Sequence, residues 1–163
     1  SSAKVALHIG EDGAETLYIF DSTAAHLEGA KKRVMMKRIA EDDGFGVEIH
    51  IEEEGGSSGK EVLRDYKTTH LAGFNVSGDR PTGSKTVRAG RWKPLAEEGR
   101  VVLVRDNDGR RGEWMDAFLS QLDRFDGTKT NGKKRDRVDA VSGGYAVAKK
   151  RKAGSFGFAV SSR

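Results

Sequence analysis

The segment from Val47 to Lys60 constrains the fold of this chain more than any other. Val47, Ile49 and Ile51 alternate with polar residues, which predicts a strand with one buried face. Three glutamates end the strand, and a loop of glycine and serine leads into a segment of helical character. A strand, a loop and a helix in this order favour a mixed α/β fold, with helices packed on a mixed sheet.

Hydrophobic periodicity predicts the other elements. Residues 4–9 and 16–20 form an antiparallel hairpin around a turn at 10–13. Helices are expected over 24–42, 57–71, 84–98, 112–125 and 135–148, and further strands over 71–76 and 101–104. The helix over 84–98 is expected to be broken near Gly90 and Pro94. In the helix over 112–125, a buried stripe is expected from Trp114, Phe118, Leu119 and Leu122.

Length and charge favour one domain over 1–148, followed by a basic, flexible tail over 149–163. The net charge is +4, and the late clusters of lysine and arginine favour a polyanionic partner, although each cluster alone is equally compatible with a solvated face. Cysteine is absent from the sequence, which excludes disulfides and thiolate metal sites. No apolar run is long enough for a transmembrane helix, so no membrane partner is expected.

Acidic residues in two distant segments are the candidate catalytic residues. Glu52 ends the strand over 47–52, and Asp136 and Asp139 share one face of the last predicted helix. Carboxylates that meet at a sheet edge can hold divalent metal ions, which in a basic protein indicates phosphodiester cleavage. An acidic turn and a helix N-terminus that favours acids are the structural alternatives. The spacing leaves open whether Glu52 or Glu53 is the metal ligand.

Other catalytic sites are less compatible with the sequence. The loop before Lys60 has one residue too few for a P-loop, and Glu61 follows where a serine or threonine would bind magnesium. His8, His26, His50 and His70 are scattered without metal-ligand spacing, and no G-x-S-x-G motif supports a serine hydrolase.

Several segments, taken in order, resemble the C-terminal nuclease domain of phage terminase large subunits. They are IEEEGGSSGK at 51–60, GSKTVRA at 83–89, AEEGRVVLV at 96–104, Trp114 with FLSQLDRF at 118–125, and DRVDA at 136–140. No single motif is specific, but their order and spacing together are. The resemblance extends to about Tyr145.

The resemblance implies an RNase H-like mixed sheet with helices on both faces. It implies a metal-dependent endodeoxyribonuclease that hydrolyses concatemeric viral DNA with two Mg²⁺ or Mn²⁺ ions. The implied partners are double-stranded DNA, the terminase ATPase domain, the small terminase subunit and the portal. The implied location is the host cytoplasm.

Carried over by position, the resemblance makes Glu52 and Asp136 catalytic metal ligands, with Asp139 as an auxiliary ligand. Basic residues expected to contact DNA are Lys60, Lys85, Arg88 and Arg91. The resemblance also implies a further metal-binding aspartate on a first strand, whereas the given sequence begins at what matches the second strand. Either the sequence is a fragment, or an upstream piece is missing from it, or another acid substitutes. Asp21 is the nearest substitute, but it is expected instead to cap the helix over 24–42. The alternatives are a catalytically incomplete module that binds nucleic acid or docks to the motor, and another RNase H-like nuclease such as a junction resolvase.

Overall fold

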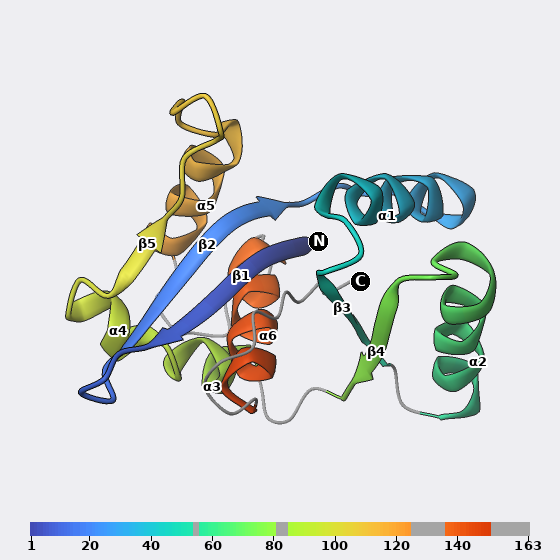
Figure 1. The fold of residues 1–163 in the computed structure, drawn as a ribbon, viewed down its shortest axis with the longest axis horizontal. Coiled ribbons are helices and arrows are strands. Elements are labelled where there is room, and N and C mark those ends of the chain that lie inside the picture. The colour runs from blue at the N-terminus through green and yellow to red at the C-terminus, as the bar shows by residue number, and fades with distance from the viewer. Residues whose placement is uncertain (54–55, 81–84, 125–135, 151–163) are drawn as a thin grey trace.

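The computed structural model of this chain describes residues 1–53, 56–80, 85–124 and 136–150. They form a mixed α/β fold with a three-stranded sheet, in the order β1-β2-β5, and a two-stranded sheet, β3-β4 (Figure 1). The first sheet combines antiparallel and parallel pairs. This confirms the predicted mixed sheet with packed helices. No helix in the described ranges is long and apolar enough to span a bilayer.

The predicted hairpin consists of β1 (Ser2–Ile9) and β2 (Glu15–Thr23). The turn contains Gly13 at φ +79°, a left-handed conformation that glycine adopts without strain. β2 continues three residues beyond its predicted end, so Asp21 lies inside the strand. The prediction that Asp21 caps the next helix is therefore wrong. That helix, α1 (Gly29–Asp43), begins five residues later than expected, and its N-cap is Glu28.

The two-stranded sheet pairs β3 (Glu48–Glu52) and β4 (Asn75–Asp79) in parallel. Between them lie α2 (Ser57–Asp65) and a π-helical turn (Tyr66–His70). β4 begins four residues later than predicted, because Leu71, Ala72 and Gly73 form a turn in which Gly73 has φ +92°. A core cluster packs α1 and the π-helical turn onto β3 and β4, through Met36, Ala40, Ile49, Ile51, Tyr66, Leu71 and Val76.

The second half of the chain supplies β5 (Val101–Leu103), which pairs in parallel with β2, and most of the helices around the larger sheet. These are α3 (Lys85–Gly90), α4 (Lys93–Glu97), α5 (Glu113–Asp123) and α6 (Asp136–Lys150). α3 and α4 separate at Arg91 and Trp92, close to the predicted break. Phe118 is fully buried as expected, but Leu119 is 38% exposed, so the predicted stripe is wrong at that residue.

α6 packs against β1 and β2 and reaches both sheets (Figure 1). Lys149 forms an ion pair with Glu15 at the start of β2. Lys150 donates a hydrogen bond to Asp79 Oδ1 at the end of β4, over 2.6 Å. The helix thus extends two residues past the predicted domain end at 148. The remainder of the predicted tail, 151–163, lies outside the described residues.

Candidate functional site

Glu52 lies at the C-terminal end of β3, beside a cavity of about 240 Å³. Lys32 of α1 and Ser58 of α2 also line this cavity. Glu53 lines it too, and its Oε1 accepts a hydrogen bond from Arg80 Nη2 over 3.0 Å. Both glutamates that the sequence left as alternatives therefore reach the same cavity.

Asp79 joins Glu52 at this sheet end, and sequence reasoning missed it. The parallel register pairs the Cα of Glu52 with that of Asp79, so their side chains leave the same face of the sheet. Ends of adjacent parallel strands meet at one edge, which is where ligands bind in open α/β sheets. The sequence placed β4 at 71–76, which left Asp79 in a loop.

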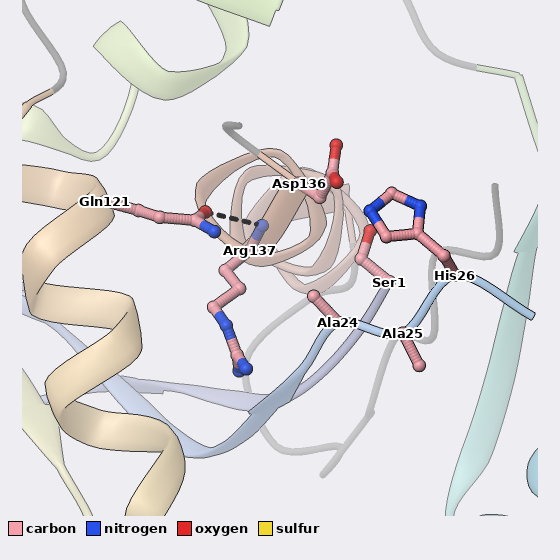
Figure 2. Close-up of a pocket in the computed structure, with 7 residues that line it drawn as sticks. All are labelled: Ser1, Ala24, Ala25, His26, Gln121, Asp136 and Arg137. Carbon is pink, nitrogen blue, oxygen red and sulfur yellow. Dashed lines mark hydrogen bonds between the residues drawn. The ribbon is translucent and has the colours of Figure 1, made fainter. Parts of the chain in front are cut away.

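Asp136, the first residue of α6, lines a second cavity of about 420 Å³. The cavity is bordered by Ser1, Ala24, Ala25, His26, Gln121, Asp136 and Arg137 (Figure 2). The backbone N–H of Arg137 donates to Gln121 Oε1 over 3.0 Å, which anchors the start of α6 to α5. In Figure 2 the side chains of Asp136 and Arg137 point away from each other.

The structure does not bring Glu52 and Asp136 together. Asp136 begins α6, whereas Lys150, the last residue of that helix, is bonded to Asp79 beside Glu52. α6 has 15 residues, so at about 1.5 Å per residue its ends lie about 22 Å apart. The two predicted metal ligands thus stand at opposite ends of α6, in separate cavities.

Asp139 and Arg88 form a buried ion pair between α6 and α3. Arg88 Nη2 lies 2.5 Å from Asp139 Oδ1, and the two residues are only 5% and 8% exposed. Next to this pair, the indole N–H of Trp92 donates to Ser142 Oγ over 3.0 Å. Asp139, the predicted auxiliary metal ligand, and Arg88, a predicted DNA contact, are therefore paired with each other inside the protein.

The other predicted DNA contacts are dispersed. Lys60 is exposed on α2, beside the two-stranded sheet, whereas Arg91 is exposed between α3 and α4. Lys85 begins α3, but its side chain lies outside the described residues. The two described and exposed cations, Lys60 and Arg91, thus lie on different elements.

Asp21, the nearest substitute for the first-strand acid, is a partly buried residue of β2. Burial raises the pKa of its carboxyl group, while hydrogen bonds from Thr23 and from the backbone at Ser22 oppose the shift. The charge of Arg137 also lowers this pKa, which places Asp21 near the start of α6.

Oxygen ligands suited to Mg²⁺ or Mn²⁺ are present, but they are not assembled. Among the described residues, no three histidine, aspartate or glutamate side chains lie together in a way that could hold a metal ion. Glu52 with Asp79 is one pair of possible ligands, and Asp136 with His26 is another. Each pair alone supplies too few ligands to hold a metal ion. The described arrangement therefore does not by itself fit a metal centre.

Comparison with known proteins identifies the family. A family model described as the terminase RNaseH-like domain matches residues 6–148, a range that includes Glu52, Asp136 and Asp139. A search of curated proteins gave no match. Because the family match covers well over half of the 163 residues, this chain belongs to the terminase RNase H-like domain family.

Proposed function

We propose that this chain is the metal-dependent endonuclease domain of a phage DNA-packaging terminase large subunit. Its substrate would be concatemeric double-stranded DNA, whose phosphodiesters it hydrolyses with Mg²⁺ or Mn²⁺ by a two-metal mechanism. The observation that carries the proposal is the family match across 6–148, which spans both acidic segments. The ATPase domain, the small terminase subunit and the portal are its proposed protein partners, and the host cytoplasm is its proposed location.

Within this proposal Glu52 and Asp136 are the essential acids. They lie at opposite ends of α6 in the described arrangement, so cleavage requires further acids or an approach of the two ends. We therefore expect cleavage by this chain to be slow, and lost when either acid is removed.

The catalytically incomplete module is the second candidate. The observation that favours it is the absence of a metal-holding cluster among the described residues. Such a module would bind DNA with strong salt dependence and would not cut it under any metal condition.

Plasmid nicking tests the proposal at its acids. Glu52→Gln and Asp136→Asn keep side-chain size but remove the charge that a divalent metal requires. Each is expected to lower the nicking rate in Mn²⁺ by at least about a hundredfold, the loss typical of an essential electrostatic group. Glu97→Gln, on exposed α4, is the matched control and should nick like the parent chain. Equal nicking by all four proteins would refute the assignment of these acids.

A further inference from the structure

The first turns of α1 carry three adjacent cations that take part in no ion pair among the described residues. These are Lys31, Lys32 and Arg33. Farther along the same helix, Lys37 and Arg38 pair with Glu41 and Asp42 over 3.7 and 3.9 Å. The two halves of α1 therefore differ. The cations near its C-terminus form ion pairs within the helix, whereas those near its N-terminus form none with the described residues.

α2 and the π-helical turn carry further cations. Lys60, Arg64 and Lys67 are exposed there and, within the part of the chain that the structure describes, take part in no ion pair. Glu61 is an exposed acid on the same helix, and Asp65 is engaged by His70 over 3.0 Å. The cations outnumber the acids on these two elements.

α1, α2 and the π-helical turn border the same cavity. Lys32 of α1 lines the Glu52 cavity together with Val62 of α2 and Tyr66 of the π-helical turn. Burial raises the pKa of the Tyr66 hydroxyl, and the charge of Arg33 opposes that shift. Lys32 therefore stands at the end of β3, where Glu52 lies, and Figure 1 shows both helices beside the β3–β4 sheet.

We propose that these cations form a phosphate-binding track for double-stranded DNA. The track consists of Lys31, Lys32, Arg33, Lys60, Arg64 and Lys67, and Lys32 binds the phosphate nearest Glu52. Long cationic side chains that lack internal partners neutralise backbone phosphates without reading sequence. A lysine in the cavity of a carboxylate would hold a phosphate there against the repulsion of that carboxylate. The inference rests on the proposed function, because it places the DNA at the Glu52 end of β3.

The salt dependence of duplex binding tests the track without requiring cleavage. Fluorescence anisotropy of a labelled DNA duplex, in buffer without divalent metal, gives the dissociation constant across a range of salt concentrations. The slope of log affinity against log salt is negative, and each lost phosphate contact reduces its magnitude by about 0.9. Lys32→Gln and Lys60→Gln are each expected to reduce the magnitude by about that amount, and to weaken binding roughly five- to tenfold near 0.1 M salt.

Lys93→Gln is the matched control, because it removes the same charge from an exposed lysine that pairs with Glu97 on α4, away from the track. It should leave the slope unchanged. A change in slope as large for Lys93→Gln as for Lys32→Gln would overturn the track, as would equal displacement of the duplex by polyglutamate and by unlabelled DNA. Circular dichroism melting of each variant confirms that folding is retained.

Cleavage in Mn²⁺, measured on the same proteins, separates this inference from the proposed function. Altered slopes without any nicking would leave the track standing and refute the nuclease. Nicking with unaltered slopes would refute the track and leave the nuclease standing.

Discussion

Arg88 shows how a residue's position in the fold can change its interpretation. In the sequence it is one of three cations in a short basic segment, which suggests DNA contact; in the structure it is buried against Asp139. A buried ion pair contributes little net stability compared with apolar side chains of similar size. Removal of one partner, however, leaves the other charge buried without compensation, which is strongly destabilising. Its Nε has no hydrogen-bond partner among the described residues, so this guanidinium is incompletely satisfied.

Asp139→Ala is therefore expected to cost about 3–5 kcal/mol in the free energy of unfolding. The double variant Arg88→Met with Asp139→Leu should cost less than that single variant, because no unpaired charge remains buried. Urea denaturation of the parent and both variants measures the difference. A double variant less stable than Asp139→Ala would contradict this account of the pair.

Asp21 gives a prediction about pH. Burial raises the pKa of its carboxyl group above its ordinary value of 3.8, so the folded state holds the proton more tightly than the unfolded state. The associated stability is present below that value and is lost as pH rises through the folded pKa. Asp21→Asn removes this pH-dependent contribution. The free energy of unfolding of the variant should therefore increase relative to that of the parent chain as pH rises from acidic to neutral. The measurement is thermal melting of both proteins across that pH range. A difference in stability between them that stays constant with pH would show that the carboxyl group is not buried as described.

At the scale of the elements, side-chain hydrogen bonds join α6 to α3 and to Trp92, the N-cap of α4. Ser142 is fully buried, accepts from the Trp92 indole and donates to the carbonyl of Val138 over 2.6 Å. Ser142→Ala leaves the buried indole N–H of Trp92 without this partner, at a cost of about 1–3 kcal/mol. Ser120→Ala, on the exposed face of α5, is the control and should change stability by less than about 0.5 kcal/mol. Equal loss in the two variants would remove Ser142 from this role.

Local patterns predicted most of the helices and strands, because alternation and helical spacing record which side of an element is buried. They were wrong where tertiary contacts decide. β2 runs on to Thr23 because it pairs with β1 there, and its residue partners, Ser2↔Thr23 and Ala3↔Ser22, are invisible in the sequence of β2 alone. His50 is one of the polar residues that alternate with Ile49 and Ile51, yet it is only 9% exposed, and burial lowers its pKa.

The arrangement of the candidate site was harder to predict than the fold. Local sequence indicated that Glu52 ends a strand and that Asp136 begins a helix, and both statements hold. It could not give their separation, which depends on the direction in which α6 crosses the larger sheet and on Lys149 and Lys150 reaching both sheets. Long-range pairing also decided that Asp139 turns to Arg88, and that Asp79 stands beside Glu52.

The family match and the separated acids lead to different expectations for the chain as a nuclease, and one measurement decides between them. It is the single-turnover cleavage of a labelled DNA duplex by the unmodified chain, in Mn²⁺ and in EDTA, with binding of the duplex confirmed in both. The proposal predicts slow cleavage that requires Mn²⁺. Duplex that is bound in a salt-dependent manner but stays intact in Mn²⁺ would contradict it, and would assign this chain to the DNA-binding modules instead.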